Sequence, residues 1–113
     1  MKKLYGVITA MTTPFDSEGK LDLSALKEQT EFLIEKGVDC LYPCGTTGEM
    51  FLCSAEERKQ IAETVVKTAA GRVTVFIHVG AMTQAETIEL ARHAQSIGAD
   101  GIGVVTPTYF NVD

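Results

Sequence analysis

Strand-like and helix-like segments alternate along the whole chain, and this alternation constrains the fold more than any other feature. Four segments rich in β-forming residues lie at 5–11, 38–42, 73–77 and 101–105. Equivalent positions in the first three, Val7, Leu41 and Val75, are 34 residues apart. One strand and one crossover helix fill such a period. The order βαβαβαβ predicts an α/β fold with a parallel sheet, either an open doubly wound sheet or part of a (β/α)₈ barrel.

Helical spacing of apolar residues and capping signals place three helices between these strands. The first helix is expected at about residues 24–36. The tetrapeptides at 54–57 and 83–86 each fit a capping box, in which a hydroxyl and a carboxylate satisfy free backbone donors, so they open the other two helices. Each helix is expected to stop at a glycine, namely Gly37, Gly71 and Gly98.

Composition indicates one globular domain and disfavours several functional classes. The chain has 113 residues, of which 45% are hydrophobic, and its net charge is −5. This acidic balance disfavours a nucleic-acid surface, which would need a basic stripe. An apolar run of about 18 residues, as a membrane span requires, is absent from the sequence. Polar residues interrupt the stretch behind the basic N-terminus, so we expect no secretory signal and a cytoplasmic protein.

The cysteines are predicted to be free, buried thiols. Their number is odd, which disfavours a disulfide framework. The spacing of Cys40, Cys44 and Cys53 matches no zinc pattern, and the sequence contains two histidines, His78 and His93. We therefore expect no metal site. His78 ends a strand and is either a polar ligand at a site mouth or a hydrogen-bonded structural residue, whereas His93 is expected on a helix surface.

The strongest local signal is Gly45-Thr46-Thr47-Gly48-Glu49, directly after the second strand. Small residues allow a tight turn whose N–H groups converge, and two hydroxyls add donors, so the loop suits a carboxylate or a phosphate. A plain turn with satisfied hydroxyls is the alternative. A Walker loop is not indicated because no Gly-Lys-Ser/Thr follows, and residues 101–106 lack the third glycine of a dinucleotide fingerprint.

The position of this loop favours a binding role. Ligands of parallel α/β folds sit at the carboxyl ends of strands. The predicted strands end at this pentapeptide and at three other polar segments, residues 12–14, 78–80 and 106–109.

These segments together resemble one known family. The pentapeptide, Thr13-Pro14-Phe15 after the first strand and Thr106-Pro107-x-Tyr109 after the fourth are similar to the dihydrodipicolinate synthase/N-acetylneuraminate lyase family. The resemblance covers the whole chain in the right order. It implies a (β/α)₈ (TIM) barrel that assembles as a tetramer of tight dimers. It also implies chemistry on pyruvate-containing substrates through a lysine Schiff base, with no metal or other cofactor.

The resemblance also implies roles for individual residues. Thr47 would hold the pyruvate carboxylate through its backbone N–H and hydroxyl. Thr46 would join a hydroxyl relay that moves protons to and from the bound intermediate. Tyr109 would extend that relay into the site of a neighbouring subunit. A carboxylate fixed by preorganised donors would orient the keto carbon toward an amine.

Within the family, Thr46 favours the synthase branch, and N-acetylneuraminate lyase is the alternative. The lyase branch is suggested by residues 41–42, 49–51, 57–58 and 78–80. Feedback by lysine is not implied, because Met50, Phe51 and Ala55 replace the residues of lysine-inhibited members.

The family's Schiff-base lysine and second tyrosine lie on later strands. The lysines of this chain are predicted in the N-terminal tail, the first loop or helices: Lys2, Lys3, Lys20, Lys27, Lys36, Lys59 and Lys67. We therefore expect residues 1–113 to form the N-terminal part, roughly half, of a single truncated barrel domain that is inactive alone. Exposed sheet edges leave an alternative of another class, a non-catalytic half-barrel that associates with itself. A flavodoxin-like module would need a covering helix after the fourth strand.

Overall fold

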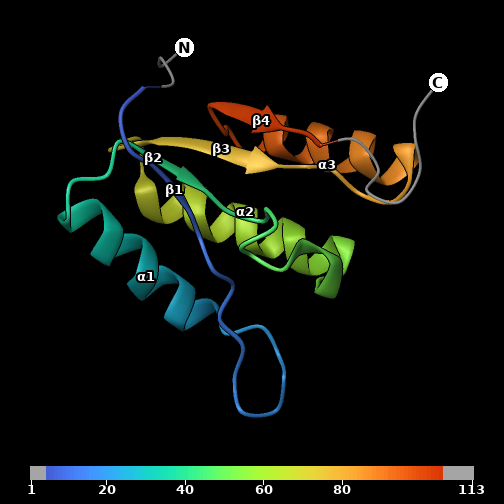
Figure 1. Cartoon of the computed structure of the whole chain (residues 1–113), viewed down its shortest axis with the longest axis horizontal. Helices are drawn as coiled ribbons and strands as arrows, with labels where there is room; N and C mark the ends of the chain where they lie inside the picture. The colour runs from blue at the N-terminus through green and yellow to red at the C-terminus, as the bar shows by residue number, and fades with distance from the viewer. Residues whose placement is uncertain (1–4, 106–113) are drawn as a thin grey trace.

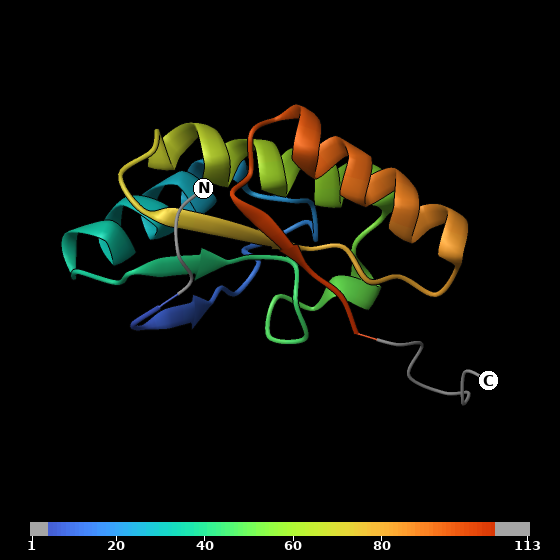
Figure 2. The same ribbon diagram turned by 90° about the horizontal axis from the view of Figure 1, so that it is seen from above.

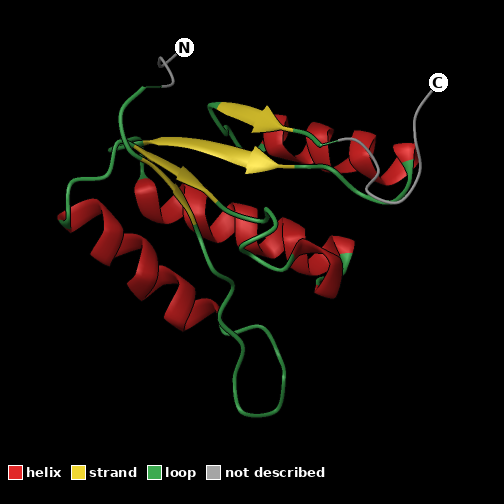
Figure 3. Ribbon diagram, in the orientation of Figure 1, coloured by secondary structure: helices red, strands yellow, loops and turns green. Residues whose placement is uncertain are grey.

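The computed structural model describes residues 5–105, and its elements follow the predicted order (Figures 1 and 3). The elements are β1 (Ile8–Ala10), α1 (Leu23–Glu35), β2 (Cys40–Tyr42), the 3-10 helix η1 (Met50–Leu52), α2 (Ala55–Ala69), β3 (Thr74–His78), α3 (Gln84–Ser96) and β4 (Gly101–Gly103). Thr106, Pro107 and Tyr109 lie outside the described residues.

The sheet within residues 5–105 is parallel and has the order β1-β2-β3-β4. Each crossover joins adjacent strands in the same direction. Because such crossovers are right-handed, they leave the sheet on one face, and α1, α2 and α3 lie together on that face (Figure 2). A doubly wound sheet needs a reversal of strand order to cover both faces. The topology is therefore that of a section of a (β/α)₈ barrel.

The hydrophobic core fills the space between the sheet and its helices. Alternate strand residues, among them Leu41, Val75 and Ile77, face this layer and are buried. They meet Leu26 of α1 and the apolar stripe of α2, which contains Ile61, Ala62, Val65 and Ala69. Burial of this stripe explains why the helical spacing was a dependable signal.

The opposite face of the sheet, the interior of a barrel, is filled by aromatic side chains that reach across strands. Tyr42 of β2 and His78 of β3 meet on this face in an edge-to-face contact, with ring centroids 5.9 Å apart. A Cβ atom at Gly103 would collide with Tyr42, and one at Gly101 would collide with Phe76. The two glycines of β4 therefore leave room for the large rings of Tyr42 on β2 and Phe76 on β3.

Helix caps agree with the predicted starts, with two differences. The predicted box of α2 is complete: Ser54 N donates to Glu57 Oε1 (2.9 Å) and Glu57 N donates to Ser54 Oγ (3.1 Å). For α3 the structure shows half of the predicted box, a bond from Glu86 N to Thr83 Oγ1 (3.2 Å). The first helix begins at Leu23 because Asp22 caps it, one residue earlier than expected.

Three strands are shorter than predicted. β1 was expected at residues 5–11, β2 at 38–42 and β4 at 101–105, whereas the paired portions are Ile8–Ala10, Cys40–Tyr42 and Gly101–Gly103. Within residues 5–105, β1 and β4 each pair with a neighbour on one side, so fewer backbone bonds hold their ends extended. None of the helices within residues 5–105 is both long enough and apolar enough to cross a membrane.

Candidate functional site

The loop after β2 is fixed against the segment that follows β1. The buried Thr13 hydroxyl donates a hydrogen bond to Gly48 O (2.6 Å). Just before it, Met11 N donates to Tyr42 O (3.2 Å) and continues the pairing of the strands. The structure thus brings together two of the polar segments that sequence reasoning assigned to the carboxyl edge of the sheet.

The Gly45–Glu49 loop is tightly turned and closely packed. Glu49 N donates to Thr46 O (3.0 Å), Met50 N donates to Gly45 O (3.3 Å), and Glu49 has a left-handed backbone (φ 57°). A Cβ atom at Gly48 would lie 3.0 Å from Met11 O. A side chain at position 48 would therefore require the loop or the segment after β1 to shift by a few tenths of an ångström.

Thr46 and Thr47 project from this fixed loop and are exposed. Within the described residues, neither hydroxyl has a hydrogen-bond partner, and neither backbone N–H donates to another group. Fixed donors with no partner of their own can hold an anion without reorganising.

Tyr42 and His78 form the barrel-interior surface beside the loop. The Tyr42 ring packs under Gly45, where a Cβ atom would lie 3.6 Å from Tyr42 Cε2. His78 is 3% exposed, and its Nδ1 has no hydrogen-bond partner within residues 5–105. Burial and the charge of Arg58 lower the pKa of His78, although a hydrogen bond with the Cys44 backbone opposes them. His78 is therefore neutral at pH 7.

This environment favours the structural interpretation of His78. A ligand at the site mouth would be accessible, whereas this side chain is covered and packs against Tyr42. The role of Tyr42 in the interior was missed, although two glycines at alternate positions of β4 were a signal that a large neighbour crosses that strand.

Arg58 is a buried cation that sequence reasoning mentioned only as part of the lyase-like pair at 57–58. It lies in the first turn of α2 and is 3% exposed. Its Nη1 donates to Gly80 O and its Nη2 to His78 O, both at 2.8 Å. Arg58 stands in helical register with the buried stripe of Ile61, Ala62 and Val65, and this register could have revealed its burial.

Two further predictions need correction. Cys40 and Cys44 are buried free thiols as expected, but Cys53 is only partly buried. Burial raises the pKa of Cys44 to about 12, against the opposing influence of Arg58, so this thiol stays protonated at neutral pH. His93 is largely covered, because it bonds Glu63 of the neighbouring helix (2.7 Å) and its side chain is 16% exposed. Within residues 5–105, no group of three metal-ligating side chains occurs.

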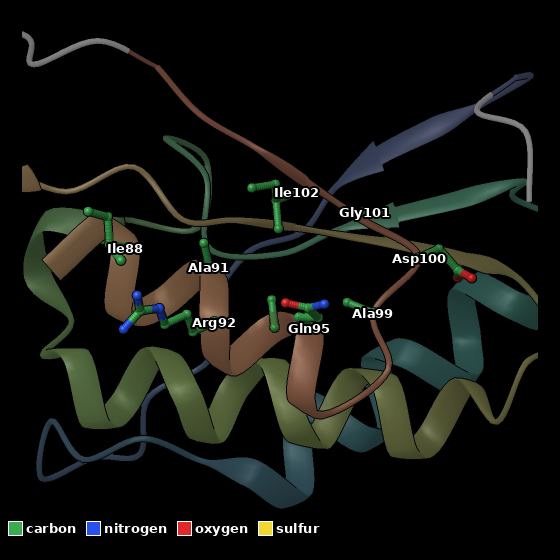
Figure 4. A pocket seen from close by; sticks show the side chains of 9 residues that line it. Ile88, Ala91, Arg92, Gln95, Ala99, Asp100, Gly101 and Ile102 are labelled. Carbon is green, nitrogen blue, oxygen red and sulfur yellow. The ribbon is translucent and has the colours of Figure 1, made fainter. Parts of the chain in front are cut away.

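A separate hollow lies on the helix side of the sheet, between α3 and β4 (Figure 4). It has a volume of about 410 Å³ and includes Ile88, Ala91 and Ile102 in its lining. Thr46 and Thr47 do not line it. Its apolar walls are suited to packing against another element of structure rather than to binding a polar substrate.

Comparison with known proteins identifies what this arrangement resembles. The N-acetylneuraminate lyase of Citrobacter koseri is 43% identical over 109 residues, which are 96% of this chain and 37% of that protein. The structure of dihydrodipicolinate synthase from Aquifex aeolicus has a TM-score of 0.90 and 40% identity, covering 94% of this chain and 36% of the other. A prophage protein of the dihydrodipicolinic acid synthase family from E. coli K12, solved in complex with pyruvate, has a TM-score of 0.91 and 42% identity, covering 96% and 36%.

The chain thus spans a little over a third of the length of these relatives. Their structures are (β/α)₈ barrels, and the four-stranded sheet described above superimposes on part of such a barrel. The synthases and lyases among them do not separate by similarity, because both reach about 40% identity. Residues 3–113 match the dihydrodipicolinate synthetase family, and the chain belongs to that family.

Proposed function

We propose that this chain supplies the carboxylate-binding rim of a pyruvate-dependent class I aldolase or lyase, and that the activity is of the dihydrodipicolinate synthase type. The observation that supports this function is the Gly45–Glu49 loop. It presents N–H and hydroxyl donors of Thr46 and Thr47 that have no partner among residues 5–105, while the Thr13–Gly48 bond holds it in place. Pyruvate, the ligand of the related E. coli K12 protein, has a carboxylate that such donors would bind.

In the proposed mechanism, the Thr47 N–H and hydroxyl hold the carboxylate of pyruvate. The keto carbon is thereby oriented toward a lysine amine, which condenses with it to an imine and releases water. The Thr46 hydroxyl transfers protons during this step. Tyr109, which lies outside the described residues, continues the relay toward a neighbouring subunit's site. Binding by fixed donors lowers the activation free energy of imine formation, because the keto carbon is already oriented toward the amine when the reaction begins.

The nucleophile is proposed to come from polypeptide outside this chain. Within the described residues, lysines lie in the first loop, on helices or at a helix end, and none lies on a strand. Residues 1–113 would then be the N-terminal part of a single barrel domain and inactive alone. The whole protein is proposed to be a cytoplasmic dimer or tetramer, which sedimentation of the complete protein would test.

Borohydride trapping tests the proposed function. The complete protein that contains this chain is incubated with pyruvate and sodium borohydride, and its peptides are analysed by mass spectrometry. A reduced pyruvyl adduct is expected on a lysine outside residues 1–113, with half-saturation at a higher pyruvate concentration in Thr47→Val. Thr12→Val is the matched control, because Thr12 is exposed nearby and bonds Gln29. No adduct, or an adduct within this chain, would contradict the proposal.

N-acetylneuraminate lyase is the alternative within the family, and the 43% identity to the Citrobacter koseri enzyme favours it. The distinguishing assay incubates the complete protein with N-acetylneuraminate and measures released pyruvate by a coupled reduction to lactate. Pyruvate release would establish the lyase activity. A trapped pyruvate adduct without such release would favour the synthase branch.

A second candidate is a half-barrel that associates with itself. The apolar hollow between α3 and β4 favours it, since Ile88 is 43% and Ile102 44% exposed. In the sheet formed by residues 5–105, β1 and β4 are the outer strands, and their edges could pair with those of another copy. Sedimentation velocity of the 113-residue chain would show a dimer. A monomer that unfolds in one sharp cooperative transition would contradict this candidate.

A further inference from the structure

We propose that Arg58 is a positioning residue whose buried positive charge biases the adjacent Gly45–Glu49 loop toward anionic keto acids over neutral carbonyl compounds. The inference rests on the proposed function, because it assigns a source of specificity to the same loop. Arg58 does not extend from the loop itself. It lies behind the loop, on α2, and acts through its charge.

The first observation is that the charge of Arg58 is not neutralised by a carboxylate. Its two hydrogen-bond acceptors are the neutral carbonyls of His78 and Gly80. Within residues 5–105, no carboxylate forms an ion pair with Arg58, and its buried Nε has no hydrogen-bond partner. A buried cation without a counter-ion is costly, so it strongly favours negative charge in its surroundings.

The second observation is the position of this charge relative to the loop. Cys44, which directly precedes Gly45, is buried with its thiol 3.9 Å from Arg58 O. The carbonyls that Arg58 holds belong to the carboxyl end of β3, next to β2. The guanidinium therefore lies beneath the edge of the sheet at which Thr46 and Thr47 are exposed.

The charge of Arg58 shifts the pKa values of neighbouring titratable groups. Arg58 lowers the pKa of His78 and opposes the burial-driven rise in the pKa values of Cys44 and Cys53. At Cys53 the carboxylate of Glu57 has a larger effect on the pKa than Arg58, and Glu49 acts in the same direction as Glu57. At Cys44, which directly precedes the loop, Arg58 is the largest charge influence, whereas both carboxylates are exposed or half-buried, where water and salt screen them.

The size of the effect is estimated for a separation on the order of 10 Å between the guanidinium and a carboxylate on the loop donors. Opposite unit charges at this separation, with an effective dielectric constant of about 20, change a binding equilibrium by roughly tenfold. The charge of Arg58 would change the binding equilibrium of a neutral ligand very little.

The test uses the complete protein and compares Arg58→Gln with Arg58→Lys, which keeps the charge. Half-saturation of borohydride trapping is measured with pyruvate and with its neutral methyl ester. Arg58→Gln should weaken pyruvate about tenfold and the ester less than twofold, and Arg58→Lys should stay within about threefold of the parent for both. A purely structural role predicts equal losses for both ligands, which would overturn the inference.

A second pair of variants keeps Arg58 and its carbonyl bonds in place, so it serves if Arg58→Gln does not fold. Cys44 has a left-handed backbone (φ 66°), a conformation that aspartate and asparagine tolerate. Cys44→Asp should weaken pyruvate about tenfold relative to Cys44→Asn, and the ester should not distinguish them. Equal pyruvate binding by this pair would overturn the inference. Absence of any adduct in the parent protein would instead refute the proposed function.

Discussion

Replacing Gly48 with alanine tests whether the candidate loop is held by close backbone packing. The new Cβ atom would lie 3.0 Å from Met11 O and 3.2 Å from both Cys44 N and Thr13 Oγ1. Two of these atoms belong to the backbone, and the third is fixed by its own bond to Gly48 O. None can move away cheaply, so the loop or β1 must shift.

Gly45→Ala is the matched control in the same loop. Its Cβ would meet Tyr42 Cε2 at 3.6 Å, which is an ordinary contact. Both substitutions reduce the freedom of the unfolded chain by the same amount, about 0.4–1 kcal/mol, so this contribution cancels between them. Overpacking costs about 1–3 kcal/mol, and we expect Gly48→Ala to have a free energy of unfolding about 2 kcal/mol below that of Gly45→Ala.

Urea unfolding followed by circular dichroism measures this difference. With a denaturant dependence of about 1–3 kcal/mol per molar, the midpoint of Gly48→Ala should lie roughly 1 M below that of Gly45→Ala. Coincident midpoints would refute the reasoning, because they would show that the loop can move away from β1 at little cost.

Three other substitutions test separate features. Ser54→Ala removes the α2 cap and should lower the free energy of unfolding, measured by urea unfolding, by about 1 kcal/mol. Ser24→Ala, at an exposed position, is the control, and equal stability of the two variants would contradict the capping role. Gly103→Ala should destabilise by about 2 kcal/mol through its collision with Tyr42, and the loss should shrink in a Tyr42→Ala background; additive losses would contradict that contact. The pKa of His78 in the folded chain is below its ordinary 6.5, so the unfolded chain binds this proton first as the pH falls. The free energy of unfolding should therefore decrease as the pH drops through 6.5 and level off below the folded pKa. His78→Gln should reduce this pH dependence, and an unchanged pH dependence would contradict the reasoning.

The parallel order of the sheet could be predicted because regular periods determine local structure. The spacing of the predicted strands required one crossover helix per strand, and the structure pairs the strands in sequence order. Leu41 pairs with Val75 as predicted, but Thr9 and not Val7 pairs with Leu41, because Val7 precedes β1. The polar segments after β1 and β2 were expected at one edge, and the Thr13–Gly48 bond joins them there. These features depend on residues close in sequence or on strand direction alone.

Features that depend on long-range side-chain contacts could not be predicted in the same way. The burial of Arg58 depends on carbonyls of His78 and Gly80, at least 20 residues away. His93 was expected to be exposed, but Glu63 covers it from α2. The spacing of apolar residues along a helix or strand indicates which face a residue lies on. The residue that it contacts on that face depends on how the helices and strands pack together.

The most direct test of the central claim is a crystal structure of the complete protein with pyruvate trapped by borohydride. We expect the carboxylate of the adduct to accept hydrogen bonds from the Thr47 N–H and hydroxyl, with Thr46 facing the reduced carbon. An adduct whose carboxylate lies elsewhere, with Thr46 and Thr47 turned away from it, would contradict the assignment of this loop.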